Sequence, residues 1–298
     1  MGNKDGLIAL SLLALGCSGD VGGGPAGEPD ASPPPPPVQR PDAAPTEVVS
    51  LTVLSYNVAG LPQGISSSDP ITNTPKISPL LNGYDLVLVQ EDFSYHGELA
   101  AGAEHPHRSE PMEQTLEDRL GDGLNRFSDF ELGELERQAW EECNGIFGAA
   151  SDCLTTKGFS VSTHVIGGVE VDVYNLHMDA GRGDKDHEAR AAQVEQMLAA
   201  MVARSDGKPL IVAGDTNMKD EDDELILANL MTKAKLIDVC RALDCPEPER
   251  IDRILVRDSA DYRIVPTSWA IADEFVDGGG EPLSDHEAVA ASLTIVAD

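Results

Sequence analysis

Short apolar runs that end in polar residues constrain this sequence more than any other feature. The runs are Leu51–Tyr56, Leu86–Gln90, Val171–Leu176 and Leu210–Gly214, and they lead respectively into Asn57, Glu91 with Asp92, His177 with Asp179, and Asp215 with Asn217. In addition, Asp252 lies inside Ile251–Val256, and Asp285-His286 directly precedes Glu287–Val296. Apolar runs rich in Val, Ile and Leu are typical of buried strands. We therefore expect a sandwich or barrel to gather these polar strand ends into one cleft.

The order of the predicted elements indicates the fold class. The predicted strands are Leu51–Asn57, Asp85–Glu91, Gly158–Val165, Val169–His177, Pro209–Gly214, Arg250–Val256 and Glu287–Val296, and the predicted helices are Lys185–Arg204 and Glu221–Lys233. Strands outnumber helices and their connections are irregular. This pattern favours an α/β fold with two packed sheets flanked by helices over a doubly wound parallel sheet.

The first seventeen residues are typical of an export signal. Leu7–Gly16 is an apolar run too short to span a bilayer, and Cys17 follows Ala14-Leu15-Gly16. A small residue before a cysteine resembles the bacterial lipoprotein cleavage box, so residues 1–17 are predicted to be a signal peptide and Cys17 a lipidation site. We expect an exported protein, anchored by lipid to the bacterial outer membrane or cell surface. An ordinary cleaved signal, which would give a secreted protein, remains the alternative.

Residues 18–47 differ in composition from the rest of the chain. They are rich in Gly, Pro, Ala and Asp, contain Pro33–Pro37, and have almost no large apolar side chains. Such a segment cannot bury a core, and polyproline is extended. The sequence therefore predicts a disordered linker over residues 18–47 and a catalytic domain over residues 48–298.

Beyond Cys17, the cysteines are Cys143, Cys153, Cys240 and Cys245. An even number of cysteines in an oxidising compartment indicates disulfides, and proximity favours Cys143–Cys153 and Cys240–Cys245. Zinc binding is less favoured, because the spacings fit no common finger and no histidine is near either pair.

The chain is strongly acidic. It has 52 acidic and 21 basic residues, a formal net charge of −31. Such a charge repels nucleic acid at long range and provides no basic stripe for a phosphate backbone, although a metal ion can invert the field inside an acidic cleft. A nucleic-acid partner is therefore disfavoured, and we expect a monomer.

The polar strand ends also indicate a chemistry. Oxygen ligands such as Glu91 and Asn57 suit Mg²⁺ better than zinc, and other divalent cations remain possible. A histidine held by a carboxylate suits proton abstraction from water. Taken one at a time, these residues would be read as turn residues, solvated strand ends or a core histidine. The series as a whole favours a metal-dependent active site.

The same series forms recognisable motifs, in the order Ser55-Tyr56-Asn57, Val89-Gln90-Glu91, Asn175-Leu176-His177, Gly214-Asp215-Thr216-Asn217, Ile251-Asp252-Arg253 and Ser284-Asp285-His286. This order resembles the endonuclease/exonuclease/phosphatase superfamily, and the resemblance extends from Leu51 to Val296. It implies a four-layer α/β/β/α sandwich of two packed mixed sheets flanked by helices, with the active site at one end of the sheets.

The resemblance also implies roles. Glu91 would be the principal Mg²⁺ ligand with Asn57 beside it, and Asp285 would reach a second metal position. His286 would be the general base, oriented by Asp252. His177 and Asn217 would hold the phosphoryl oxygens, and Asp215 would orient the attacking water or assist the leaving oxygen. Where the family often has tyrosine after the aspartate of the Ile-Asp motif, this chain has Arg253. Its side chain is expected on the opposite face of the strand, where it would alter packing rather than disturb Asp252.

Two features favour a lipid substrate such as sphingomyelin. Asp152-Cys153-Leu154 followed by Lys157-Gly158-Phe159 resembles an element of neutral sphingomyelinases, in which Lys157 would contact the phosphate. An acidic surface also tolerates a zwitterionic headgroup better than a polyanion. The alternatives are a secreted Mg²⁺-dependent nuclease and, from another class, a non-catalytic surface-binding protein. Trp269–Phe275, leading into Gly278–Gly280, is the candidate membrane-contacting loop, and a flexible rim of the active site is the other reading.

Overall fold

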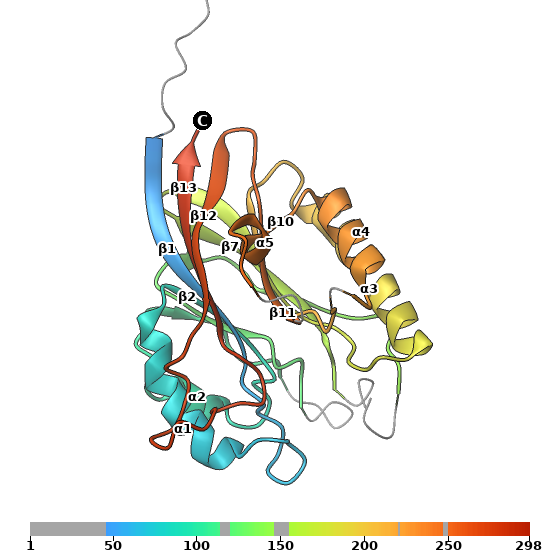
Figure 1. Ribbon diagram of the computed structural model, residues 1–298. Helices are drawn as coiled ribbons and strands as arrows, with labels where there is room; N and C mark the ends of the chain where they lie inside the picture. The colour runs from blue at the N-terminus through green and yellow to red at the C-terminus, as the bar shows by residue number, and fades with distance from the viewer. Residues whose placement is uncertain (1–45, 114–119, 146–154, 220, 247–249) are drawn as a thin grey trace, which may run out of the picture. The chain divides into compact units, whose positions relative to one another are not determined.

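The computed structural model describes residues 46–113, 120–145, 155–219, 221–246 and 250–298 (Figure 1). The predicted signal peptide, the lipidation site at Cys17 and the linker up to residue 45 lie outside these residues. Strand β1 (Thr46–Asn57) begins two residues before the domain start that the sequence predicted at Val48. No helix in the described part of the chain is both long and apolar enough to cross a membrane.

The first sheet has six strands in the order β12-β13-β1-β2-β4-β3. Besides β1 it contains β2 (Leu86–Gln90), β3 (His107–Arg108), β4 (Asn125–Ser128), β12 (Tyr262–Ile271) and β13 (Val289–Ala297). β1 pairs with β2 in parallel and with β13 antiparallel, so the sheet is mixed.

The second sheet has seven strands, in the order β10-β11-β9-β8-β7-β5 with β6 also paired to β7. Its strands are β5 (Glu131–Leu132), β6 (Glu136–Ala139), β7 (Gly158–Ile166), β8 (Val169–His177), β9 (Leu210–Asp215), β10 (Ile237–Asp238) and β11 (Asp252–Arg257). β8 and β9 are parallel and β11 is antiparallel to β9, so this sheet is also mixed.

Helices cover the outer face of each sheet. α1 (Pro70–Leu80), the 3-10 turn η1 (Leu81–Gly83) and α2 (His96–Ala100) pack on the first sheet, and α3 (Asp184–Arg204) and α4 (Glu224–Ala234) pack on the second (Figure 1). The short α5 (Val239–Ala242) follows β10. Both predicted helices are present with small shifts of their ends. The longest elements that were not predicted are α1 and β12, and the short elements η1, α2, α5, β3, β4, β5, β6 and β10 were not predicted either.

Three apolar clusters separate the four layers. Leu51 and Val53 of β1 face the second sheet, where they share a cluster with Val171 and Val173 of β8. Leu54 and Tyr56, the alternate residues of β1, pack against the α1 side. Tyr174 and Leu176 of β8 pack against α3 in the same way. The α/β/β/α sandwich is therefore confirmed, because side chains that alternate along a strand fill two different layers.

The face between the sheets changes character along the strands. On β1 the inward positions run from Leu51 and Val53 to Ser55 and Asn57, so the column is apolar at one end and polar at the other. The inward columns of the neighbouring strands change in the same direction and end in Gln90, Asn175 with His177, Asp215 and Asp252. This alternation brings polar side chains from both sheets to one end of the inter-sheet layer.

Two further predictions concern the disulfides and the membrane-contacting loop. Cys240 and Cys245 form a disulfide, as predicted, whereas Cys153 of the other pair lies outside the described residues. In the segment Trp269–Phe275, predicted as the membrane-contacting loop, Trp269 lies at the end of β12 and is half-buried against the inter-sheet cluster, and Phe275 is buried in the cluster under α1. Phe275 therefore fills an apolar layer, whereas part of the Trp269 side chain stays exposed, and membrane contact by this segment stays a prediction.

Candidate active site

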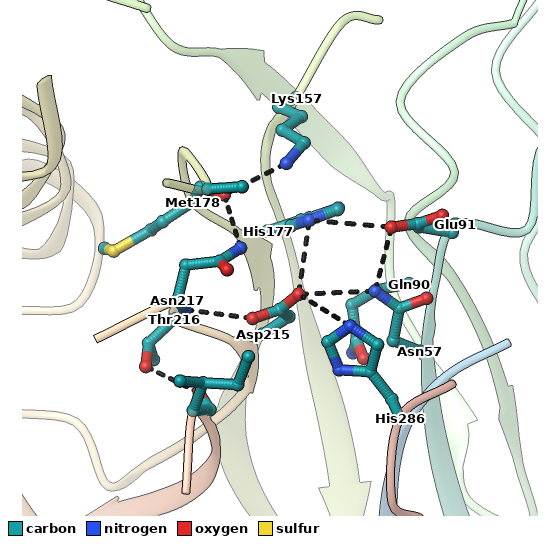
Figure 2. Close-up of polar contacts among 12 residues, drawn as sticks. Asn57, Gln90, Glu91, Lys157, His177, Met178, Asp215, Thr216, Asn217 and His286 are labelled. Atoms are coloured by element: carbon teal, nitrogen blue, oxygen red, sulfur yellow. Dashed lines mark hydrogen bonds and ion pairs between the residues drawn. The ribbon is translucent and has the colours of Figure 1, made fainter. Parts of the chain in front are cut away.

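A cluster of polar side chains lies at the polar end of the inter-sheet layer (Figure 2). Asn57 at the end of β1 donates from Nδ2 to Glu91 Oε1 at 3.0 Å and to Asp215 Oδ2 at 3.3 Å. His177 at the end of β8 has its Nε2 3.3 Å from Asp215 Oδ2 and 3.9 Å from Glu91 Oε1. Two residues of the first sheet therefore meet two of the second around one point.

A histidine–aspartate pair borders this cluster. His286 Nδ1 lies 2.8 Å from Asp252 Oδ2, and its other ring nitrogen, Nε2, lies 3.7 Å from Asp215 Oδ2. Ser284 fixes the segment that carries His286, since its hydroxyl donates to the backbone oxygen of Asn57 at 2.7 Å and accepts from His286 N at 3.2 Å. One imidazole nitrogen is thus held by a carboxylate while the other faces the cluster.

The loop after β9 supplies Asn217. Its backbone N–H donates to Asp215 Oδ1 at 2.9 Å, and its Nδ2 donates to the backbone oxygen of Met178 at 3.0 Å. Lys157 Nζ lies 3.3 Å from the same oxygen (Figure 2). The loops after β8 and β9 are therefore tied together beside His177.

Several residues of the cluster have a backbone conformation that is uncommon for non-glycine residues. The φ angles of Ala59, Glu91 and Asn217 are 49°, 57° and 51°. The left-handed conformation costs roughly 1–2 kcal/mol for a residue such as Glu91, less for an asparagine, and it concentrates at functional sites. Gly214, just before Asp215, has φ 143°, and a Cβ there would overlap the backbone of Leu176. These constraints aim the Glu91 and Asp215 carboxylates into the cluster.

The pKa values of the two histidines are shifted in opposite directions. Burial by itself would lower the pKa of His286, but the nearby carboxylates of Asp215 and Asp252 outweigh burial and raise it above its ordinary value. Burial lowers the pKa of His177, and the positive charges of Lys157 and His286 lower it further. His177 is therefore a neutral hydrogen-bonding group at neutral pH, whereas His286 has a high affinity for a proton.

The pKa values of both carboxylates in the cluster are raised. Burial raises the pKa of Glu91, although the hydrogen bond from Asn57 and the charge of Lys157 oppose the increase. Burial also raises the pKa of Asp215, with His286 opposing and Asp252 reinforcing the increase. Both shifts therefore arise first from burial, which disfavours the charged form of each carboxyl group.

This donor set fits a divalent cation. The oxygens of the buried Asp215 and the partly exposed Glu91 converge on one amide, and hard cations such as Mg²⁺ prefer oxygen ligands of this kind. Asn57 presents its Nδ2 to the carboxylates, while its Oδ1 accepts from Ala59 N at 3.1 Å. A bound cation would relieve the cost of keeping these two carboxylates charged in a site shielded from water.

Asp285, predicted to reach a second metal position, lies at the rim. Its side chain is exposed and accepts hydrogen bonds from Ser67 and Ser284. A different trio, Asp215, Asp252 and His286, has ligand atoms within 4.8 Å of one another. Because His286 and Asp252 already share a 2.8 Å hydrogen bond, this trio suits proton transfer better than coordination.

Polar residues beneath the cluster had received no role in the sequence analysis. Gln90 Nε2 donates to Asn175 Oδ1 at 2.7 Å, and Asn175 Nδ2 donates to the backbone oxygens of Val89 and Asn125. These buried amides connect the two sheets directly under the site. Gln90 and Asn175 could have been found from the sequence. Each is a polar residue at an inward-facing position of an otherwise apolar strand, and the same alternation identified Asn57.

Arg253 faces away from the cluster, as expected from its place next to Asp252. Its fully buried guanidinium donates to Asp238 Oδ2 at 2.9 Å and to the backbone oxygen of Met218 at 2.9 Å. Arg250 contacts the same carboxylate at 2.5 Å. Arg253 therefore supports the Asp215–Met218 turn from the outer face of the second sheet.

A curated relative shares about a third of its residues with this chain over the aligned region. A sphingomyelinase of Mycobacterium tuberculosis (strain ATCC 25618 / H37Rv) is 34% identical over 278 residues, covering 85% of this chain and 55% of that protein. The chain thus spans about half the length of this curated relative.

Solved structures show the same fold at low identity. TDP2 of D. rerio complexed with a single-strand DNA product has a TM-score of 0.64 at 17% identity, with 82% of this chain and 98% of that chain covered. Beta toxin of Staphylococcus aureus with bound magnesium ions has a TM-score of 0.59 at 16% identity (82% and 99%). Sphingomyelinase C of Streptomyces griseocarneus has a TM-score of 0.57 at 20% identity (82% and 99%).

The family itself is shown by the sequence. Residues 54–286 match the model of the Endonuclease/Exonuclease/phosphatase family, a span that runs from β1 to His286 and includes every residue of the cluster. The chain belongs to the Endonuclease/Exonuclease/phosphatase family.

Proposed function

We propose that this chain is a metal-dependent phosphodiester hydrolase that acts on a phospholipid headgroup such as that of sphingomyelin, with His286 as general base. The observation that carries the proposal is that seven polar residues from six different segments meet at one end of the inter-sheet layer. These residues are Asn57, Glu91, His177, Asp215, Asn217, Asp252 and His286. A cluster of this composition can position a water, hold phosphoryl oxygens and stabilise the charge that develops on them.

Each residue has a distinct task in this proposal. His286 Nε2 takes the proton from the attacking water, while Asp252 holds Nδ1 at 2.8 Å and stabilises the imidazolium that forms. His177, kept neutral by burial, and Asn217 donate hydrogen bonds to phosphoryl oxygens, and Lys157 adds positive charge beside them. Asp215 orients the water between the two histidines.

Glu91 and Asn57 would hold a divalent cation, with Mg²⁺ the best fit to their oxygen donors. When bound, the cation supplies charge stabilisation to the phosphoryl oxygens and the leaving oxygen. Beta toxin with bound magnesium ions shares this fold, which supports a divalent ion here. Asp285 at the rim is a further candidate ligand.

A lipid substrate is favoured over nucleic acid by two independent observations. The curated relative at 34% identity is named a sphingomyelinase. The formal net charge of −31 opposes the approach of a polyanion but not of a zwitterionic headgroup. A nuclease is the second candidate, because TDP2 complexed with a single-strand DNA product has the same fold.

Export and lipid attachment through Cys17 belong to the same proposal. They would place the catalytic domain, as a monomer, where it meets lipid outside the cytoplasm. Their support is the composition of residues 1–17. Labelling of growing cells with a radioactive fatty acid tests the attachment, since a Cys17→Ser variant should lose the label.

A parallel assay tests the proposed activity. The purified chain is incubated with sphingomyelin vesicles, supercoiled DNA and a small phosphate monoester, each with Mg²⁺ and with EDTA. We expect release of phosphocholine that requires Mg²⁺ and little reaction with the other two substrates. Mg²⁺-dependent nicking of DNA without release of phosphocholine would favour the nuclease instead, and turnover that EDTA leaves unchanged would contradict metal dependence.

A further inference from the structure

A cavity borders the His286–Asp252 pair on the side of β12. Its volume is about 220 Å³, and its walls include Asp252 and His286 together with Trp269, Asp285 and Glu287. Neither Trp269 nor Glu287 has a part in the hydrolytic cluster. The cavity is formed where the start of β11, the last part of β12 and the segment before β13 come together.

The walls of this cavity carry an excess of negative charge. Asp252, Asp285 and Glu287 contribute carboxylates. The Asp252 side chain is only 7% exposed, and its Oδ1 has no hydrogen-bond partner among the residues that the structure describes. Arg250 also borders the cavity, but its guanidinium is paired with Asp238 at 2.5 Å. A buried carboxylate oxygen without a partner favours a cationic occupant.

Trp269 limits the kind of cation. Its ring is half-buried, packs partly against the inter-sheet cluster and borders the cavity. An aromatic face combined with carboxylates attracts alkylated ammonium groups through cation–π interaction, and tryptophan is the strongest of the aromatic residues in this respect. A metal ion would need oxygen ligands on all sides, and the indole supplies none.

The volume of the cavity limits the size of the group that it can bind. Pockets that bury drug-sized ligands have volumes of roughly 300–1,000 Å³, so 220 Å³ suits a small headgroup better than a nucleoside. The acidic walls would also repel any further phosphate of a nucleic acid. Both arguments favour a compact cationic group.

The position of the cavity decides which part of a substrate could enter it. In an in-line displacement the leaving oxygen departs opposite the attacking water, and the water lies beside the base. Because His286 itself lines the cavity, the leaving alcohol cannot occupy it. The occupant must be a substituent that stays on the phosphorus after the reaction.

We propose that this cavity binds the quaternary ammonium group of a phosphocholine headgroup, with Trp269 as its aromatic wall and Asp285 and Glu287 as its counter-charges. The inference rests on the proposed function, since it assumes that phosphate binds at the Asn57–Asp215 cluster. It makes phosphocholine the retained product, and it assigns choice of headgroup to residues outside the hydrolytic cluster.

Calorimetric titration of the full chain in the presence of Mg²⁺ tests the assignment. The probes are phosphocholine, its uncharged carbon isostere 3,3-dimethylbutyl phosphate, and inorganic phosphate. We expect phosphocholine to bind about tenfold more tightly than the isostere, the size of effect that a cation–π contact and neighbouring carboxylates supply. Equal affinity for the two esters would overturn the proposal.

Variants locate the effect. Glu287→Gln should reduce the preference for phosphocholine severalfold, and Trp269→Leu should nearly abolish it, while the affinity for inorganic phosphate stays unchanged in both. Glu281→Gln, the same charge change at an exposed residue that does not border the cavity, is the matched control. Because Trp269 also packs on the core, Trp269→Phe serves if the leucine variant does not fold, and it should retain most of the preference. A preference unaltered by both Glu287→Gln and the tryptophan variants would exclude this cavity.

The outcome is separable from that of the proposed function. A chain that hydrolyses no phosphodiester but selects phosphocholine through Glu287 would refute the hydrolase and keep the cavity assignment. A chain that hydrolyses sphingomyelin with unchanged headgroup selectivity in all the variants would keep the hydrolase and refute the cavity assignment.

Discussion

His286 is the single residue on which the proposed chemistry depends most. It is held by Asp252 and Ser284 and contributes little to any apolar cluster, so replacement should leave the fold intact. We expect His286→Ala to melt within a few degrees of the parent chain while its kcat falls by about 10²–10⁴-fold, the usual effect of losing a general base. His107→Ala, at the edge of the first sheet, is the control and should keep full turnover. Near-normal turnover in His286→Ala would remove the assignment.

Asp252 sets the proton affinity of that base. Its negative charge, with that of Asp215, raises the pKa of His286 even though burial lowers it, and only the deprotonated imidazole can accept a proton. Asp252→Asn removes one of these charges, so the pKa of His286 should fall and the acidic limb of the kcat/KM profile should move to lower pH by about one to two units. The maximum rate should also drop about a hundredfold, because the imidazolium is less stabilised. A limb that moves to higher pH, or that moves equally in the exposed Asp261→Asn control, would contradict this role.

At the scale of the elements, Asp172 connects β7, β8 and the end of α3. Its buried carboxylate accepts from Thr163 Oγ1 at 2.6 Å, Ser205 Oγ at 2.7 Å and Lys208 Nζ at 3.2 Å. Although burial raises the pKa of Asp172, these hydrogen bonds outweigh it and leave the pKa below its ordinary value. The stability that comes from the charged form is therefore fully present above the ordinary pKa of about 3.9 and is lost as pH falls through the lower folded-state pKa.

Asp172→Asn should therefore destabilise the chain at neutral pH and progressively less below about pH 4. We expect a loss of about 1–3 kcal/mol at pH 7, the cost of leaving buried partners unsatisfied. Urea denaturation at several pH values measures it. Glu170→Gln, at an exposed position two residues away on the same strand, should change stability little at any pH. A deficit that grows on acidification would show that the sign of the argument is wrong.

Arg253 joins β11 to the turn that carries Asn217. Arg253→Met leaves Asp238 with Arg250 but removes one of two cations from a buried carboxylate, together with the hydrogen bond to the backbone oxygen of Met218. We therefore expect a cost of about 2–3 kcal/mol of unfolding free energy. The exposed pair Arg263–Asp298 is the matched control, and Arg263→Met should cost no more than about 1 kcal/mol. Thermal melts compare the two. Similar losses in both variants would show that burial of Arg253 has no special weight.

For the whole molecule, net charge predicts which membranes the chain can approach. A formal charge of −31 repels an anionic surface, and salt screens that repulsion with a Debye length of about 10 Å at 0.1 M. Addition of phosphatidylglycerol to sphingomyelin vesicles should therefore slow hydrolysis several-fold at low salt and have little effect at high salt. Initial rates of phosphocholine release measure it, with uncharged phosphatidylcholine as the matched additive. Faster hydrolysis of the anionic vesicles would point to a basic contact surface.

More of the candidate site than of the secondary structure could be predicted from the sequence. Asn57, Glu91, His177 and Asp215 could be chosen because each follows an apolar run, and strand ends converge. The same reasoning did not find α1, because Pro75 and Pro79 lie inside it and proline is a poor guide to a helix interior. It also missed β12, in which Pro266 lies next to an irregularity of the pairing with β13.

The alternation of residues along the chain was enough to predict two packed sheets and the set of polar strand ends, and the resemblance of the motifs identified the family and implied mixed sheets. The two sheets and the strand ends depend on local periodicity, because each strand must alternate between two layers. Tertiary structure alone decided that Trp269 and Phe275 pack against apolar layers, that Arg253 pairs with Asp238, and that a cavity opens beside His286. Those features depend on contacts between segments far apart in the chain, and no local pattern of residues encodes which surfaces will meet.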